Sequence, residues 1–464
     1  MFRSRRIAVG SLFVLVLAAC RGEHPDLSHV GLELPGVDAG IAKIENTKVD
    51  GGDAGTMMPP GDMACPAPST TELDDVVRLS ATDDFACAVR RGGSVVCWGR
   101  NDQQYKVMGA GSLAVARPVT IADLANVRNV ATGNGHACAF DANGVLKCWG
   151  SNFVGEAGQG SVGGVVYPPR PSTLAGVTAL GVGSDHVCAA TADKVFCWGS
   201  PNYGRTAQDP NGGASGTPVE VMGLTGTPSA LSAGAEATCA VMKQAAGTTT
   251  YCWGSNYNGL LGTGSSSDLD FRVPQVVTAL STRFADVTLS NSGFGCARSD
   301  SVPVSCWGHN VSGAIGDVLP GSGVRTPVQA SASVLDANVK RVASMGYGTC
   351  AITGAGNVAC LGANGAAQLG GGTGDLTGHG TPTLVRAARD NDAKLGSVFD
   401  VAVGGTAGDN GFVCAAVGDR PACGGKVVCW GSNQYGQLGN AASVDGSNAS
   451  AIEPFPVRVA LPLP

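Results

Sequence analysis

The chain has 464 residues, of which 14% are charged and 44% hydrophobic, and its formal net charge is −6. Nucleic acids and anionic membrane surfaces attract clustered Lys and Arg, so the 30 scattered basic residues give no basis for a nucleic acid partner. The 17 cysteines and 70 glycines instead indicate a turn-rich chain from an oxidising compartment, where disulfides persist.

The N-terminus has the features of a lipoprotein signal peptide. A basic start is followed by an apolar run over residues 7–17, which is too short to span a bilayer. The motif LAAC that ends at Cys20 resembles a bacterial lipobox, so we expect residues 1–19 to be removed and Cys20 to be lipidated. An ordinary signal peptide is the alternative. By resemblance to bacterial lipoproteins, Arg21 rather than Asp after the lipidated Cys implies delivery to the outer membrane.

Residues 20–74 are predicted to be a flexible tether, because they hold Gly- and Pro-rich stretches such as GGDAG and PPGD without apolar periodicity. Residues 75–464 then form the folded domain. The predicted location is the bacterial cell envelope, as an outer membrane lipoprotein attached through its lipid anchor, or otherwise outside the cell as a secreted protein.

One pattern occurs seven times in the folded domain: a Cys, a short polar stretch that usually contains Gly, a second Cys and normally Trp-Gly. CAVRRGGSVVCWG from Cys87 is the first copy, and residues 76–460 divide into seven units of about 55 residues. Each unit offers a β-like run before the first Cys, as in residues 127–131, then the two arms of the Cys hairpin. A run opened by proline follows, as at Pro118 and Pro274. Four short strands per unit without a credible helix predict an all-β fold and match the blade of a β-propeller, and such units must stack or close into a ring.

Each cysteine pair is predicted to close its own hairpin. Cysteines equidistant from a tight turn face each other at a Cα separation that suits a disulfide, whereas zinc sites favour pairs two to four residues apart. The seven predicted pairs are Cys87 with Cys97, Cys138 with Cys148, Cys188 with Cys197, Cys239 with Cys252, Cys296 with Cys306, Cys350 with Cys360, and Cys414 with Cys429.

Two cysteines remain once Cys20 is assigned to the lipid. Cys423 interrupts the tip of the seventh hairpin, and Cys65 lies just before the first unit. Ring closure would bring these units together, so we expect a disulfide between Cys65 and Cys423, with free or reshuffled thiols as the alternative.

The repeat resembles that of the regulator of chromosome condensation family, and more closely its secreted bacterial form. The motifs are His-x-Cys-Ala, Cys-Trp-Gly-Ser-Asn and Gly-Gln-Leu-Gly, with CWGSNQYGQLG from Cys429 as the best copy. The resemblance is imperfect, because only His136 and His186 fill the His position and Leu361 replaces one Trp. It implies seven units closed into a ring, a seven-bladed β-propeller, in which the tryptophans are packing residues: Trp98, Trp149, Trp198, Trp253, Trp307 and Trp430.

The resemblance also bears on function. Nuclear and cytosolic members of the family act as exchange factors for small GTPases or bind chromatin, whereas the secreted bacterial ones look like binding proteins. A signal peptide and paired cysteines argue against a small GTPase as partner of this chain. We also expect no catalytic residue, cofactor or metal, because the six histidines form no metal-spaced cluster. The carboxylate pairs Asp74-Asp75 and Asp83-Asp84 are interpreted as solvated turn residues.

The candidate binding residues are aromatic and follow Trp-Gly at nearly the same position of their units. They are Phe153, Tyr203, Tyr257 and Tyr435, which a closed ring would display on one rim, although padding of the blade edges is the alternative interpretation. Loops that break the repeat are where specificity is expected, namely residues 205–216, 263–270, 370–381, 404–411 and 418–426.

The sequence thus predicts a non-enzymatic, membrane-anchored extracytoplasmic propeller that binds a protein or a cell-surface glycan. One alternative is a secreted polysaccharide lyase or hydrolase, which would be marked by acidic or His side chains that converge on the central channel. The other is a purely structural envelope protein.

Overall fold

The structure is a computed structural model, and it describes most of residues 65–462. The gaps are residues 103–105, 110, 112, 266, 278–283, 300–301, 317–322, 330–334, 336–337, 373–374, 390–391, 406–409 and 441–451. The expected signal peptide, Cys20 and most of the expected tether lie outside the described residues, so these assignments stay predictions.

Seven antiparallel sheets of four strands follow one another along the described chain. Blade 1 comprises β1 (Val76–Thr82), β2 (Phe85–Arg90), β3 (Val95–Arg100) and β4 (Ala114–Thr120), and blade 2 comprises β5 (Val127–Thr132), β6 (His136–Asp141), β7 (Leu146–Ser151) and β8 (Val165–Pro171). Blade 3 comprises β9 (Ala179–Val182), β10 (His186–Ala190), β11 (Val195–Gly199) and β12 (Ser215–Glu220), and blade 4 comprises β13 (Thr227–Ala233), β14 (Ala237–Gln244), β15 (Gly247–Ser255) and β16 (Asp270–Val276). Blade 5 comprises β17 (Phe284–Leu289), β18 (Phe294–Ser299), β19 (Ser305–His309) and β20 (Gly323–Gln329), and blade 6 comprises β21 (Arg341–Met345), β22 (Gly348–Ile352), β23 (Val358–Gly362) and β24 (His379–Leu384). Blade 7 comprises β25 (Val398–Gly404), β26 (Phe412–Val417), β27 (Lys426–Ser432) and β28 (Ile452–Arg458).

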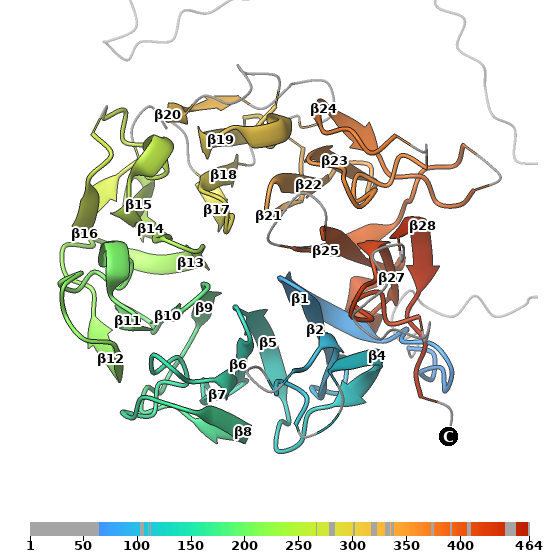
Figure 1. The fold of residues 1–464 in the computed structure, drawn as a ribbon, viewed down its shortest axis with the longest axis horizontal. Coiled ribbons are helices and arrows are strands. Elements are labelled where there is room, and N and C mark those ends of the chain that lie inside the picture. The colour runs from blue at the N-terminus through green and yellow to red at the C-terminus, as the bar shows by residue number, and fades with distance from the viewer. Residues whose placement is uncertain are drawn as a thin grey trace, which may run out of the picture. The chain divides into compact units, whose positions relative to one another are not determined.

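The seven sheets form a ring, in which the first strand of every blade is innermost (Figure 1). The first strands of successive blades pack against one another, and β1 contacts both β5 and β25, which closes the circle. The described helical structure consists of four single 3₁₀ turns: η1 (Asn202–Gly204), η2 (Tyr257–Gly259), η3 (Val311–Gly313) and η4 (Pro421–Cys423). The predicted all-β, seven-bladed propeller is confirmed.

The fourth strand of each blade is the outer edge of its sheet, and prolines occur there as the pattern predicts. A proline has no N–H to donate, so it is tolerated where a strand has a partner on one side only. These edge prolines include Pro118 in β4, Pro218 in β12, Pro274 in β16, Pro327 in β20, Pro382 in β24 and Pro456 in β28.

The second and third strands carry the paired cysteines opposite each other. Cys87 of β2 faces Cys97 of β3, and the other six blades repeat this register. Each of the seven pairs is a disulfide in the structure, and the two Cα atoms of each pair are 4.0 to 4.1 Å apart. The eighth disulfide joins Cys65 to Cys423.

Each tryptophan ties its blade to the preceding one. All six indoles are buried, and each Nε1–H donates to a backbone carbonyl of the blade before it, as Trp149 does to Val107 at 2.9 Å. Trp98 of blade 1 donates to Gln437 of blade 7 at 2.8 Å, so the same contact closes the ring. A buried apolar ring with a satisfied N–H is a favourable packing unit, and this explains why the repeat keeps Trp.

The sixth blade replaces this contact. Leu361 stands where the other blades have Trp, and its cross-strand neighbour Thr349 donates its hydroxyl to the carbonyl of Ala314 at 3.0 Å. The carbonyl that an indole would have satisfied is therefore still paired.

The compact unit begins at Ala64, earlier than the expected start at residue 75. Leu73 is fully buried; its N–H donates to Val459 at 3.1 Å, and its carbonyl accepts from Val427 at 2.9 Å. The assignment of residues 65–74 to the tether is therefore corrected. These residues lack the repeat motif, so the sequence pattern did not mark them as part of the ring.

Candidate functional site

The two ends of the ring carry different turns. Because the strands of a blade are antiparallel, the turn after the first strand and the loop after the third emerge at the same end. We call this end the front face and the opposite end the back face. The loops that follow Trp-Gly, with the four candidate aromatic residues, therefore lie on the front face.

An asparagine shapes the loop after Trp-Gly. In blade 7 the Oδ1 atom of Asn433 accepts the N–H of Leu438 at 3.0 Å, and in blade 4 Asn256 accepts the N–H of Leu261 at 3.1 Å. The same contact is made by Asn101, Asn152, Asn310 and Asn364. Such side-chain bonds to nearby backbone stabilise tight turns, so the Ser-Asn of the motif builds the loop and is not a ligand set.

Three of the four candidate aromatic residues are exposed on this face. Phe153, Tyr203 and Tyr257 are 53%, 42% and 61% exposed. Tyr435 is half-buried, and the guanidinium of Arg100 lies 5.2 Å from its ring centre. The loops thus present three aromatic rings to solvent, whereas the ring of Tyr435 is covered in part by Arg100.

A cavity of about 200 Å³ lies next to Tyr257, at the junction of blades 4 and 5. Glu236, Asn291 and His309 line it, together with Ala235, Asn258, Leu260, Ser292 and Gly293. A carboxylate, an amide, an imidazole and an exposed phenol ring meet here. This mixture of one aromatic wall and a few polar groups is typical of small binding pockets.

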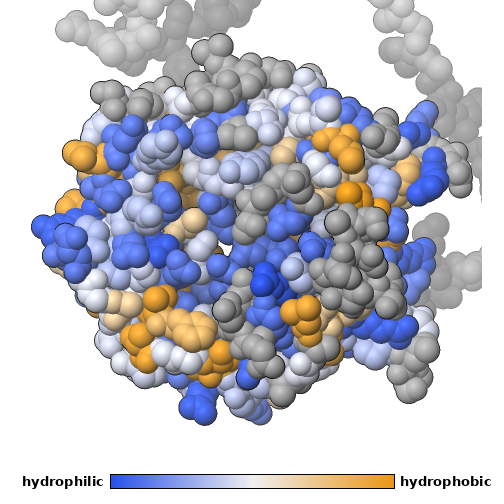
Figure 2. Space-filling model, viewed as in Figure 1, coloured by the Kyte–Doolittle hydropathy of each residue, from blue (hydrophilic) through white to orange (hydrophobic). Residues whose placement is uncertain are grey.

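The turns around the centre of the ring carry acidic side chains, and Figure 2 shows a hollow at that centre bordered by hydrophilic residues. Asp83 and Asp84 form the turn between β1 and β2, and they are only 3% and 5% exposed. The interpretation of this pair as solvated is therefore wrong. Closure of the ring covers them, which a turn sequence by itself does not reveal.

Burial raises the pKa of Asp83 to about 7, and the neighbouring charge of Asp84 adds to the rise. Asn291, from the equivalent turn of blade 5, donates to the Asp83 carboxyl at 3.5 Å. Burial also raises the pKa of Asp84, although the positive charge of Arg100, which contacts the Asp84 carboxylate at 3.3 Å, acts to lower it. Thus one carboxyl holds its proton up to neutral pH, while its neighbour lies beside a cation.

The two repeat histidines are buried structural groups. Burial lowers the pKa of His136 and of His186, and the charge of Arg205 lowers the pKa of His186 further. His186 Nε2 lies 2.7 Å from the hydroxyl of Thr238 in the next blade, and His136 Nδ1 lies 3.4 Å from the carbonyl of Asn134. Both act as hydrogen-bonding residues at strand ends, as the repeat position predicts.

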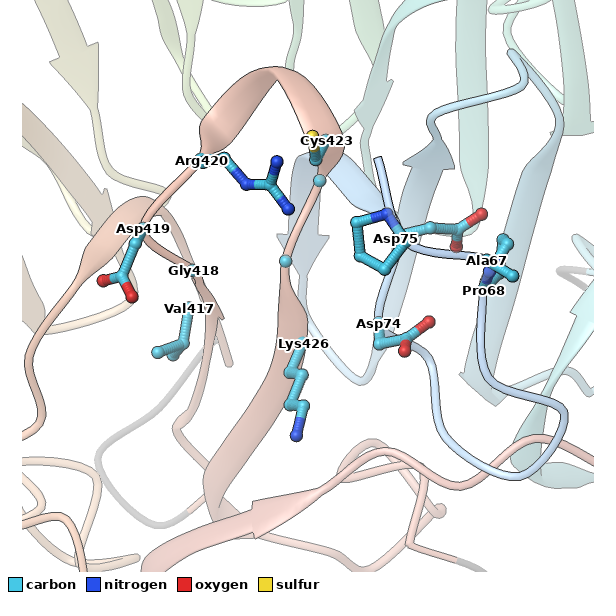
Figure 3. A pocket seen from close by; sticks show the side chains of 13 residues that line it. Ala67, Pro68, Asp74, Asp75, Val417, Gly418, Asp419, Arg420, Cys423 and Lys426 are labelled. Atoms are coloured by element: carbon cyan, nitrogen blue, oxygen red, sulfur yellow. The ribbon is translucent and has the colours of Figure 1, made fainter. Parts of the chain in front are cut away.

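A second cavity, of about 280 Å³, opens on the back face beside the Cys65–Cys423 disulfide. Its walls come from residues 66–68 and 74–75 on one side and from residues 417–426 on the other. Figure 3 shows Arg420 and Cys423 on one wall, opposite Asp74 and Asp75. The loop at residues 418–426, which breaks the repeat, therefore builds this cavity.

Several residues of the front cavity were not singled out by the sequence. Glu236 and Asn291 lie in turns after first strands, where the repeat has no fixed residue. His309 stands where Ser151, Ser255 and Ser432 follow Cys-Trp-Gly, so this departure from the repeat was the available signal. Within the described residues, no group of three His, Cys, Asp or Glu side chains could hold a metal ion. In this part of the chain, no helix is long and apolar enough to cross a membrane.

Comparison with protein families identifies the repeat. Models of the "Regulator of chromosome condensation (RCC1) repeat" match residues 76–104, 127–156, 177–205 and 249–293. Each matched segment begins in the inner half of a blade or in its hairpin and includes the Trp-Gly motif.

Curated relatives share part of the chain. The human E3 ubiquitin-protein ligase HERC2 is 26% identical over 252 residues, which is 52% of this chain and 5% of that protein. The bovine secretion-regulating guanine nucleotide exchange factor is 29% identical over 245 residues, which is 46% of this chain and 51% of that protein. The chain thus spans about half of the length of the exchange factor and 5% of the length of the ligase.

Solved structures agree with the fold. The yeast protein Prp20p, from a study of its binding to Gsp1p and histones, superposes with a TM-score of 0.62 at 18% identity and covers 82% of this chain and 87% of its own. Human WBSCR16 gives a TM-score of 0.64 at 17% identity over 80% of this chain and 94% of its own. At these identities the likeness concerns the fold alone.

Proposed function

We propose that this chain, a seven-bladed propeller of regulator of chromosome condensation repeats, is a non-enzymatic binding protein that holds a protein partner on its front face. The observation that carries the proposal is the exposed Tyr257 beside a cavity with a carboxylate at its wall. Exposed aromatic rings at the edge of a pocket are the usual anchors of protein interfaces. Phe153 and Tyr203, on the loops of blades 2 and 3, extend the same face.

A protein partner fits this face better than a glycan does. The three exposed rings belong to three separate blades, so they can contact a broad surface at several points. Only one of them, Tyr257, lines the cavity at the junction of blades 4 and 5. The exposed rings and the cavity together form a face that extends over blades 2 to 5. A glycan bound by Tyr257 alone is the competing outcome in the test below.

The partners that are named for the similar proteins do not suit the compartment that we propose for this chain. Gsp1p and histones are named for Prp20p, and nucleotide exchange is named for the bovine relative. Eight disulfides support an oxidising compartment for this chain, in which cytosolic GTPases are not present. We therefore propose an extracytoplasmic protein as partner.

Membrane attachment at Cys20 belongs to this proposal. The signal-peptide pattern and the lipobox-like motif support it. Radiolabelled fatty acid should be incorporated into the wild-type chain and not into the Cys20→Ala variant, and equal labelling of the two would contradict the anchor. Fractionation of outer and inner membranes then tests the predicted outer membrane location.

Crosslinking tests the binding face. The full chain with a photoreactive phenylalanine at Tyr257 should crosslink an envelope or secreted protein, whereas the same group at Met222, which is 71% exposed in the loop after β12 on the back face, should not. With that partner, Tyr257→Ala should weaken binding at least about tenfold, as for an anchor residue. Met222→Ala is the matched control. Crosslinks from Met222 alone, or a glycan as the captured species, would reject the protein-binding front face.

A second candidate function is favoured by one observation, the pKa of about 7 at Asp83 beside the carboxyl of Asp84, which contacts Arg100 at 3.3 Å. Carboxyl pairs of unequal pKa serve as acid and base in polysaccharide hydrolysis. The two cavities described above do not include either residue, which is why this function is second. Release of reducing ends from envelope polysaccharides, lost in Asp83→Asn, would support it; no release from any of them would reject it.

A further inference from the structure

The eight disulfides fall into two environments. The fourteen hairpin cysteines are at most 2% exposed, whereas Cys65 and Cys423 are both half-buried. A thiol reagent must reach a sulfur atom in line with the S–S bond, so burial protects the hairpin disulfides for as long as the blades stay folded. Among the described cysteines, this leaves Cys65 and Cys423 as the pair that a reagent can reach.

The back cavity provides the access. It has a volume of about 280 Å³, and Cys423 is one of its lining residues. Figure 3 shows the Cys423 side chain at the cavity wall, close to Arg420. A small thiol can therefore approach this disulfide from solvent without opening a blade.

The charges around the pair favour its cleavage. Arg91 donates from Nη1 to the carbonyl of Cys423 at 3.4 Å and from Nη2 to the carbonyl of Pro66 at 3.0 Å, so its guanidinium bridges the two linked segments. A nearby cation stabilises a departing thiolate and thereby speeds thiol–disulfide exchange. Arg420 and Lys426 add positive charge to the cavity wall.

Three carboxylates also face the cavity, but each is engaged elsewhere. Asp75 accepts from Arg90 at 2.8 Å, Asp419 accepts the hydroxyl of Ser397 at 2.6 Å, and Asp74 accepts the N–H of Ser69 at 2.9 Å. Their partners reduce the repulsion that these anions would exert on a thiolate.

We infer that Cys65–Cys423 is an exchangeable disulfide, a redox modification site that an external dithiol can reduce in the folded protein. A thiolate of the dithiol attacks one sulfur, a mixed disulfide forms, and the other cysteine leaves as a thiolate that takes a proton from water. The second thiol of the reagent then displaces the first cysteine. The protein gains two thiols and the reagent becomes a disulfide.

Reduction should release the segment that begins at Cys65 from the seventh hairpin and leave the ring closed. Cys65 and the residues just after it lose their covalent link to η4, which forms the opposite wall of the back cavity. The backbone bonds of Leu73 to Val459 and Val427, and the hydrogen bond from Trp98 to Gln437, do not involve this disulfide. The state of the disulfide thus controls the width of the back cavity without unfolding the propeller.

Timed reduction tests the inference. The full chain is incubated with dithiothreitol at pH 7.5, quenched with iodoacetamide and mapped by mass spectrometry. Cys65 and Cys423 should be alkylated at least about 100-fold faster than the hairpin cysteines, while the circular dichroism spectrum and Tm transition of a folded ring persist. Alkylation of hairpin cysteines at a similar rate, or no alkylation before unfolding, would overturn the inference.

Arg91 tests the charge effect. Arg91→Gln should slow the reduction by about threefold to tenfold, and Arg91→Lys should restore most of the rate, because the positive charge returns. Arg170→Gln, at an exposed position of β8 in blade 2, removes the same charge in another blade and is the matched control. If Arg91→Gln is reduced as fast as Arg170→Gln, the assigned role of Arg91 is wrong.

Discussion

Three junctions inside the chain are joined by hydroxyl groups, whereas the junction that closes the ring is joined by a carboxylate. Ser232 of blade 4 accepts the N–H of Leu289 in blade 5 at 2.8 Å, and Ser80 and Thr288 make the equivalent contact to their following blades. Between blades 7 and 1 the equivalent position is Ala402, which has no hydroxyl. Asp400, two residues earlier, accepts the N–H of Leu79 at 2.8 Å instead.

The closing junction has further contacts in the part of the chain that the structure describes. The Cys65–Cys423 disulfide, the backbone bonds of Leu73 and the pair of Glu72 with Arg458 all join the start of the ring to its end. Consecutive blades are held near each other by the chain itself, whereas the first and last are not, so closing them costs more conformational entropy. The disulfide and these added contacts therefore occur at the junction where the chain itself does not hold the two blades together.

Replacement of Asp400 should have the largest effect. The side chain is fully buried, and besides Leu79 of blade 1 it binds Arg341 Nε of blade 6 at 2.9 Å, so it joins blade 7 to both of its neighbours. Asp400→Ala leaves the Leu79 N–H and the guanidinium without this partner, so we expect a loss of about 3–5 kcal/mol in the free energy of unfolding, measured in urea. Ser232→Ala, at an internal junction, should cost only about 1 kcal/mol. Equal losses would contradict the distinction between the two junctions.

Asp83 should make the first blade sensitive to pH. The unfolded chain loses this proton near pH 3.8, whereas the folded chain keeps it up to about pH 7, so the native state binds more protons between these values. Stability should therefore fall as pH rises through this window, by up to about 4 kcal/mol from this group. The difference in unfolding free energy between Asp83→Asn and wild type should grow over the same window. A constant difference from pH 4 to pH 8 would show that Asp83 ionises normally.

The sixth blade tests whether a hydroxyl can replace an indole at an internal junction. Thr349→Val removes the donor to the buried carbonyl of Ala314 and should cost about 1–3 kcal/mol in urea unfolding. Thr349→Ser keeps the hydroxyl and should cost less. A valine variant as stable as the serine variant would mean that this carbonyl does not need a partner.

The smallest effect is expected at the exposed part of the closing junction. Arg458 Nη1 lies 2.7 Å from Glu72 Oε1, and the Arg458 side chain is 60% exposed. Glu72→Gln should lower the unfolding free energy by less than about 1 kcal/mol, and added salt should reduce the difference further. Glu220→Gln, which removes the exposed pair with Lys194, is the matched control. A much larger loss at Glu72 would show that this pair holds the closure.

The repeat made the fold and its internal packing predictable. Cysteine spacing placed Cys87 opposite Cys97, because a two-stranded hairpin fixes which residues face each other. Prolines marked the outer strands, since only an edge strand tolerates a missing N–H. The site was less predictable. Tyr257 was found because it recurs in the repeat, whereas Glu236 and Asn291 occupy turn positions where the repeat has no fixed residue.

The amino-acid sequence by itself determined the seven hairpins and their disulfides, because these contacts join residues close in the chain, and the repeat marked the tryptophan that six of the blades bury. Tertiary structure alone decided what ring closure brings together. It buried Asp83 and Asp84, paired Asp400 with Leu79 across 321 residues, and made residues 65–74 part of the ring. Contacts between residues so far apart in the chain produce no repeating sequence pattern, because they depend on how the last blade meets the first.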